Sequence, residues 1–144
     1  MKKAIWFDMD GTIANLYGVE NWLEYLINED TKPYAIAKPL INMNSLARVL
    51  NRLARNGYTI NIISWTSKGG TEEYNARVTE VKKEWLRKHL ASVKFTAIDI
   101  VPYGTAKGEN RNGILFDDEE KNRNEWKNGK AYNVNNILEI LKAL

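Results

Sequence analysis

The spacing of apolar residues changes repeatedly along the chain, and each spacing predicts one kind of element. Apolar runs that end at polar or turn residues predict strands at 3–8, 58–64, 94–102 and 113–118, with a short last strand at 131–134. Apolar residues at helical spacing predict helices at 19–30, 43–56, 71–90 and 135–144. The segment 31–40 contains two prolines and is expected to be irregular.

The order of these elements predicts the fold class. Strands that alternate with helices are typical of α/β proteins, in which a parallel sheet is covered by helices on both faces. A length of 144 residues suits one domain of this Rossmann-like kind. In such sheets the ligand binds at the carboxyl ends of the strands. We therefore expect the functional residues just after the predicted strands.

Chemically active side chains do follow the predicted strands. The stretch "IWFDMDGTIANL" places two acids, separated by one residue, directly after the first strand. The later strand ends add a hydroxyl, a cation and a pair of acids: Asp8, Asp10, Ser64, Lys107, Asp117 and Asp118. Buried carboxylates are costly unless they are paired or bind a metal, so this group needs a cation or a shared proton.

Composition excludes several other kinds of site. The chain has no cysteine, which excludes disulfides, a thiolate nucleophile and Cys-ligated metal centres. The net charge of +3 comes from basic residues interleaved with acids, as in "EVKKEWLRKH", which is typical of a solvated helix and weak support for nucleic-acid binding. No apolar stretch is long enough for a membrane span or a signal peptide, so we expect a cytoplasmic protein.

The motifs at the strand ends resemble those of the haloacid dehalogenase (HAD) superfamily. The stretch "DMDGT" at 8–12 resembles motif I, Asp-x-Asp-x-Thr after a hydrophobic strand. Ser64 in "INIISWTS" resembles motif II, Lys107 resembles motif III, and "ILFDDEE" resembles the acidic pair of motif IV. The four motifs occur in the family's order and cover nearly the whole chain.

The resemblance implies a role for each residue. Asp8 is expected to be the nucleophile that forms an aspartyl-phosphate, and Asp10 the general acid and then the general base. Ser64 is expected to bind a phosphoryl oxygen, and Lys107 to neutralise charge. Mg²⁺ is the expected cofactor, held by Asp8, Asp117, Asp118 and the backbone carbonyl of Asp10.

Three further residues are expected to contact the substrate. Thr12 belongs to motif I, and Thr66 competes with Ser64 for the motif II position. Trp65 either stacks on a base near the phosphate or packs in the core. Tyr17, Trp22 and Tyr103 are further aromatic candidates.

Each motif also has a plain structural interpretation. The 8–12 stretch has the composition of a turn that caps a helix, and the pair at 117–118 could cap the helix "EEKNRNEW". Lys68, in a loop, competes with Lys107 for motif III. His89 is expected to be a surface residue rather than a catalyst.

The resemblance also suggests a substrate class. A small helical cap insert at about 14–42 leaves a fairly open site, and the overall layout resembles small 5'-nucleotidase and 5'(3')-deoxyribonucleotidase-like proteins. We therefore expect Mg²⁺-dependent hydrolysis of nucleoside monophosphates. A nucleic-acid 3'-phosphatase and a non-catalytic binding protein are the alternatives. The stretch "WLEYLI" at 22–27 suits either the core of the cap or the surface of a homodimer.

Overall fold

The computed structural model describes residues 3–144, which build a five-stranded parallel sheet in the order β5-β4-β1-β6-β7. Its strands are β1 (Lys3–Phe7), β4 (Tyr58–Trp65), β5 (Ala97–Val101), β6 (Ile114–Phe116) and β7 (Ala131–Tyr132). The larger helices are α3 (Met43–Arg55) and α4 (Glu72–His89), and the shorter ones are α5 (Glu120–Glu125), η2 (Val134–Asn136) and α6 (Ile137–Lys142). The predicted fold class, a parallel α/β sheet of the Rossmann-like kind, is confirmed.

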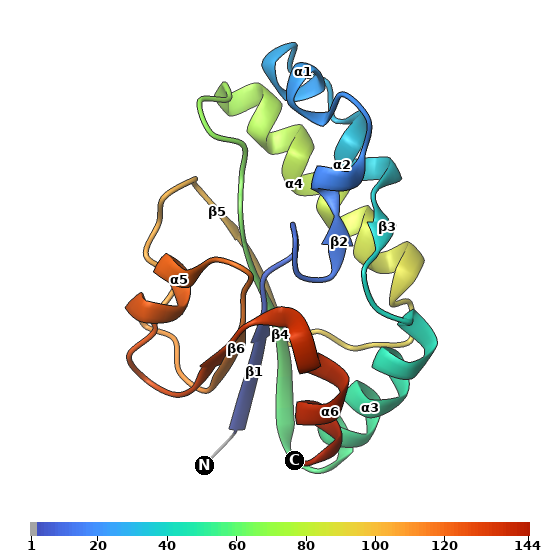
Figure 1. Cartoon of the computed structure of the whole chain (residues 1–144), viewed down its shortest axis with the longest axis vertical. Helices are drawn as coiled ribbons and strands as arrows, with labels where there is room; N and C mark the ends of the chain where they lie inside the picture. The colour runs from blue at the N-terminus through green and yellow to red at the C-terminus, as the bar shows by residue number, and fades with distance from the viewer. Residues whose placement is uncertain (1–2) are drawn as a thin grey trace.

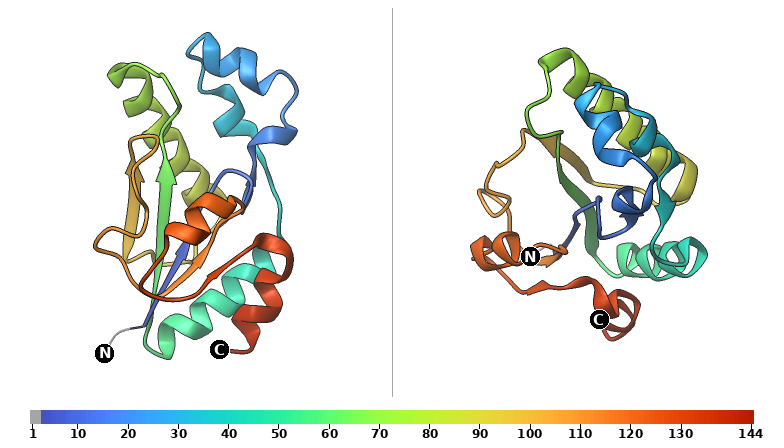
Figure 2. Two further views of the ribbon diagram at one scale, coloured as in Figure 1. Left: turned by 60° about the vertical axis from the view of Figure 1, so that its left-hand side comes forward. Right: turned by 45° about the horizontal axis from the view of Figure 1, so that its top comes forward.

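Helices cover both faces of the sheet (Figures 1 and 2). The side chains of β1 alternate between two apolar cores. Ile5 and Phe7 point to the face that packs against α3, α4 and α6. Trp6, between them, points to the opposite face, where Trp126 packs just after α5. This alternation is the strand period of two, with both sets buried.

Helix α3 follows the predicted pattern closely. The side chain of Asn42 caps its start by accepting a hydrogen bond from the Ser45 N–H. The apolar positions of the helix face the core: Leu46, Val49, Leu50 and Leu53. Gly57 ends the turn after the helix with φ of 95°, a conformation that L side chains rarely adopt.

The segment from residue 14 to residue 39 stands over the carboxyl ends of the strands, beside α4 (Figure 1). It contains η1 (Leu16–Gly18), α1 (Trp22–Ile27) and α2 (Lys32–Ile36), and its ends pair as the antiparallel strands β2 (Ala14–Asn15) and β3 (Lys38–Pro39). Three hydrogen bonds from α4 anchor it: Tyr74 Oη donates to the Asp30 carbonyl at 2.9 Å, Trp85 Nε1 to the Ala37 carbonyl at 2.8 Å, and the guanidinium of Arg77 to the Glu29 carbonyl at 3.3 Å.

Two sequence predictions in this segment were wrong. Residues 31–40 are not irregular, because Pro33 lies in the first turn of α2, where a missing N–H costs nothing, and Pro39 lies in a short strand. The helix predicted at 19–30 is confined to α1, because Asn21 adopts a left-handed conformation with φ of 62° just before it. Within residues 3–144, no helix is both long and apolar enough to cross a membrane.

Candidate active site

The register of the sheet places the predicted residues at one edge. Phe7 is paired with Ile62 of β4 on one side and with Phe116 of β6 on the other. The backbone N–H of Asp8 donates to the Phe116 carbonyl at 2.9 Å. Asp8 and Asp117, which directly follow β1 and β6, therefore emerge next to each other at the carboxyl ends of the central strands.

Lys107 lies between these two carboxylates. Its Nζ is 2.8 Å from Asp8 Oδ1 and 2.8 Å from Asp117 Oδ2, and its side chain is 2% exposed. Burial alone would lower the pKa of Lys107, but the charges of Asp8 and Asp117 outweigh burial and raise it. Lys107 is therefore a positive charge held at the centre of the site, a position that Lys68 does not share.

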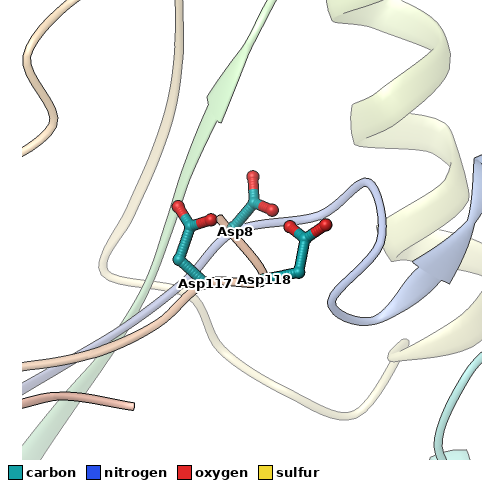
Figure 3. A group of neighbouring side chains, drawn as sticks. All are labelled: Asp8, Asp117 and Asp118. Atoms are coloured by element: carbon teal, nitrogen blue, oxygen red, sulfur yellow. The ribbon is translucent and has the colours of Figure 1, made fainter. Parts of the chain in front are cut away.

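Asp8, Asp117 and Asp118 form a cluster of carboxylates, each with an oxygen within 4.8 Å of the others (Figure 3). Burial, with the nearby charge of Asp8, raises the pKa of Asp117 to about 6 and that of Asp118 to about 8. Asp117 Oδ1 also accepts the Glu119 N–H at 2.9 Å. The alternative that the 117–118 pair caps the helix is wrong, because the N-cap of α5 is Glu119.

Gly11 permits the close approach of Asp118. It has φ of 82°, and a Cβ at this position would collide with the Asp118 carboxylate. Thr12, expected to contact the substrate, is instead 1% exposed, and its hydroxyl donates to Asp8 Oδ2 at 3.0 Å. Thr12 therefore orients Asp8 and lies outside the cavity wall.

The carboxylate cluster fits a hard divalent cation. All of its donors are carboxylate oxygens, the ligands that Mg²⁺ prefers, and their charge exceeds that of the one ammonium group between them. The side chain of Asp10 lies outside this cluster. Its predicted contribution to a metal site, the backbone carbonyl, stays a prediction.

Asp10 is held instead by Lys82, a residue that the sequence analysis missed. Lys82 Nζ lies 2.8 Å from Asp10 Oδ2, in an ion pair in which the lysine side chain is 1% exposed. Burial raises the pKa of Asp10, although the charge of Lys82 partly opposes that effect. The signal lay in the helical spacing, because Lys82 falls on the apolar stripe of α4 with Val78 and Trp85.

The two hydroxyl candidates of motif II occupy different places. Ser64 is 1% exposed, and its Oγ accepts a hydrogen bond from Lys82 Nζ at 2.8 Å. Thr66, one residue beyond the end of β4, lines the cavity. The structure thus places Ser64 beside the Asp10 ion pair and Thr66 in the cavity wall.

A cavity of about 450 Å³ opens between this cluster and the 14–39 segment. Asp8, Asp10 and Lys107 lie in its wall. Apolar and aromatic side chains make up most of the remainder: Leu16, Tyr17, Trp22, Leu23, Leu26, Ile27, Tyr34, Trp65 and Tyr103. One buried lining atom, Asn122 Oδ1, has no hydrogen-bond partner within residues 3–144.

The predicted aromatic candidates meet around this cavity. The rings of Trp65 and Tyr103 have centroids 4.8 Å apart, and those of Tyr17 and Trp22 are 5.0 Å apart. Trp65 is also fixed to the protein, because its Nε1 donates to the Thr105 carbonyl at 2.9 Å.

Two other residues considered in the sequence lie away from the carboxylates. Lys68 is exposed at the rim of the cavity, with its Nζ 5.8 Å from the centre of the Tyr103 ring. His89 packs against Trp85 at the end of α4, outside the cavity wall, and burial lowers its pKa. Neither residue contacts the carboxylates.

Comparison with known proteins identifies the fold. No family model matches the chain, and no curated protein matches it. A D,D-heptose 1,7-bisphosphate phosphatase from Burkholderia thailandensis has a similar structure, with a TM-score of 0.59 and 12% identity over 99% of this chain and 97% of that one. The D,D-heptose 1,7-bisphosphate phosphatase from B. bronchiseptica, solved with magnesium and phosphate, has a TM-score of 0.51 and 12% identity over 85% of this chain and 74% of that one. The chain therefore shares the fold of these phosphatases.

Proposed function

We propose that this protein is a Mg²⁺-dependent phosphomonoester hydrolase of the HAD type that acts on nucleoside monophosphates. The observation that carries the proposal is the buried cluster of Asp8, Lys107 and Asp117 beside a cavity that five aromatic residues help to line. Two phosphatases of the same fold support the reaction class, and one of them was solved with magnesium and phosphate.

Asp8 is the proposed nucleophile. A carboxylate oxygen of Asp8 attacks phosphorus while the bond to the leaving oxygen breaks, and protonated Asp10 gives its proton to that oxygen. Asp10, now ionised, then takes a proton from water as the water oxygen attacks phosphorus. The bond between phosphorus and Asp8 breaks, which releases phosphate and restores Asp8.

The remaining polar groups support this reaction. Lys107 keeps its positive charge next to Asp8 and offsets the negative charge of an arriving phosphate. Thr12 fixes Asp8 through its hydroxyl. Asp8, Asp117 and Asp118 would hold Mg²⁺, which when bound lets a phosphate dianion approach the carboxylates.

The cavity lining suits a nucleotide. Nine of its twenty residues are leucine, isoleucine or aromatic and offer an apolar surface to a base, and polar residues such as Glu29, Thr66 and Ser67 are available to the sugar hydroxyl groups. Flat bases stack on aromatic rings with about 1–3 kcal/mol per base. A volume of about 450 Å³ falls within the range of small-molecule sites. In this proposal residues 14–42 act as the small cap that covers the base.

Phosphate release from a substrate panel tests the proposal. The panel contains nucleoside 5'- and 3'-monophosphates, a heptose bisphosphate, glycerol phosphate and a 3'-phosphorylated oligonucleotide, each with Mg²⁺ and with EDTA. We expect Mg²⁺-dependent release, fastest from a nucleoside monophosphate. Preference for the oligonucleotide, with steep loss of activity in salt, would instead identify a nucleic-acid 3'-phosphatase. Tight nucleotide binding without release would identify a binding protein.

Tyr103 allows a sharper test of base stacking. Trp65 is unsuitable because it also bonds Thr105 and lies under Lys107, with Nζ 5.0 Å from its ring centre. Tyr103 is 49% exposed, so Tyr103→Ala leaves the core intact. We expect kcat/KM for nucleotides to fall about 5- to 150-fold, with glycerol phosphate unchanged. Ile36→Ala, which removes an exposed apolar side chain outside the cavity wall, is the control.

A further inference from the structure

Lys82 is a buried lysine whose three donors are all used. It projects from α4 and is 1% exposed. Its Nζ donates to Asp10 Oδ2 at 2.8 Å, to Ser64 Oγ at 2.8 Å and to the Trp65 carbonyl at 2.7 Å. An ammonium group has three N–H donors, so this set satisfies it completely. Lysine is almost never fully buried without such partners.

The partners of Lys82 come from separate parts of the fold. Asp10 follows β1, whereas Ser64 and Trp65 end β4. On its open side the ammonium group faces the ring of Tyr34 in α2, with 5.1 Å from Nζ to the ring centre. Lys82 therefore connects the turn after the first strand, the end of the neighbouring strand and the segment above the cavity.

The contact leaves one oxygen of Asp10 for chemistry. Lys82 holds Oδ2, and Oδ1 has no hydrogen-bond partner within residues 3–144. Asp10 lines the cavity, and its side chain is 19% exposed. The ion pair thus restricts the rotation of the carboxyl group and leaves Oδ1 unpaired in a residue that lines the cavity.

We propose that Lys82 is a positioning residue that aims Asp10 Oδ1 at the leaving-group oxygen of the substrate. This inference rests on the proposed phosphatase function and adds a role for the residue that holds the general acid. Lys82 itself does not touch the substrate, because its three donors are already occupied by protein acceptors. A misplacement of about 1 Å in a catalytic group costs on the order of 100-fold in rate.

The dependence on the leaving group separates positioning from general structural support. An alkyl phosphate needs a proton on its leaving oxygen, whereas p-nitrophenyl phosphate releases a stable anion without one. The ratio kcat/KM reports the step up to phosphoryl transfer onto Asp8. For Lys82→Met we expect kcat/KM to fall about 10- to 100-fold for an alkyl monophosphate and less than about 3-fold for p-nitrophenyl phosphate.

Further variants complete the test. Lys88→Met, which removes an exposed lysine from the same helix, should leave both values unchanged. Asp10→Asn should show the same contrast between the two esters, and adding Lys82→Met to it should cause little further loss, because both changes remove one function. If Lys82→Met does not fold, Lys82→Gln, which retains two N–H donors, takes its place.

Distinct results would overturn the inference. Equal loss for both esters in Lys82→Met, with an active wild-type protein, would show that Lys82 only supports the fold. Fully additive losses in the double variant would show that it does not act through Asp10. A folded wild-type protein that hydrolyses neither ester with Mg²⁺ would overturn the proposed function, and this inference with it.

Discussion

Replacing Lys107 by methionine should destabilise the protein strongly. Lys107 is 2% exposed and makes two contacts of 2.8 Å with Asp8 and Asp117, whose side chains are also buried. Removing one partner of a buried ion pair leaves an uncompensated charge and costs about 3–5 kcal/mol. For a chain of 144 residues this corresponds to a fall in Tm of about 10–20 °C.

The loss should depend on pH and on Mg²⁺. Burial already raises the pKa of Asp117 to about 6, and without Lys107 it rises further, so the folded variant binds extra protons. Groups with a raised folded pKa contribute stability at low pH that is lost as pH rises. The deficit relative to wild type should therefore be larger at about pH 8 than at about pH 5. Millimolar Mg²⁺ should reduce it by restoring positive charge.

Thermal melts of the metal-free and Mg²⁺-loaded proteins measure these effects. Lys68→Met is the matched control, because Lys68 is an exposed loop lysine at the rim of the same cavity. Its effect should stay within about 0.5 kcal/mol. If Lys107→Met melted like Lys68→Met, or if its deficit were equal at both pH values, the buried charge balance described for this site would be refuted.

Three further predictions concern the neighbouring residues. Asp10→Asn should lower kcat/KM for alkyl monophosphates about 10²- to 10⁴-fold in phosphate release, and it should also lower Tm in melts, because the buried ammonium of Lys82 loses its counter-charge. Gly11→Ala should cost about 1–2 kcal/mol in urea denaturation, because φ is 82° there, and should weaken Mg²⁺ binding in calorimetry by displacing Asp118. Raised pKa values of about 6 for Asp117 and about 8 for Asp118 mean that the folded metal-free protein holds more protons than the unfolded chain; its stability, measured in EDTA, should therefore fall between about pH 4 and pH 8.

The core of the fold could be predicted because its signals are local. Strands β1, β4 and β6 are apolar runs that end at turns, and α3 combines a helical stripe with a capping residue. Helix α2 was not predicted, because the two prolines of residues 31–40 suggested irregular structure. Pro33 in fact occupies a first-turn position of α2, where a helix tolerates proline. The start of α1 depends on the left-handed backbone of Asn21, which no spacing rule indicates.

The candidate site was predictable to the extent that strand order determines it. The carboxyl ends of parallel strands meet at one edge, so Asp8, Lys107 and Asp117 could be expected together before any contact was known. Lys82 was missed because the charges around it resemble a solvated helix face. Its burial depends on Asp10, which lies 72 positions away in the chain. Local charge patterns carry no information about such partners.

Which hydroxyl groups face the cavity could not be predicted from the sequence either. Thr12, expected to contact the substrate, faces Asp8 rather than the cavity, because the Met9 carbonyl holds the turn after β1. Ser64 and Thr66 are two positions apart, so they would point the same way in a continuous strand. Only Thr66 lines the cavity, and it lies beyond Trp65, where β4 ends.

The most direct measurement is phosphate release from a nucleoside monophosphate by the wild-type protein and by Asp8→Asn, each with Mg²⁺ and with EDTA. The proposed mechanism predicts that the wild type releases phosphate with Mg²⁺ but not with EDTA. It predicts no release by Asp8→Asn, although that variant melts cooperatively. Release by Asp8→Asn at the wild-type rate, or none from any ester by a folded wild-type protein with Mg²⁺, would contradict it.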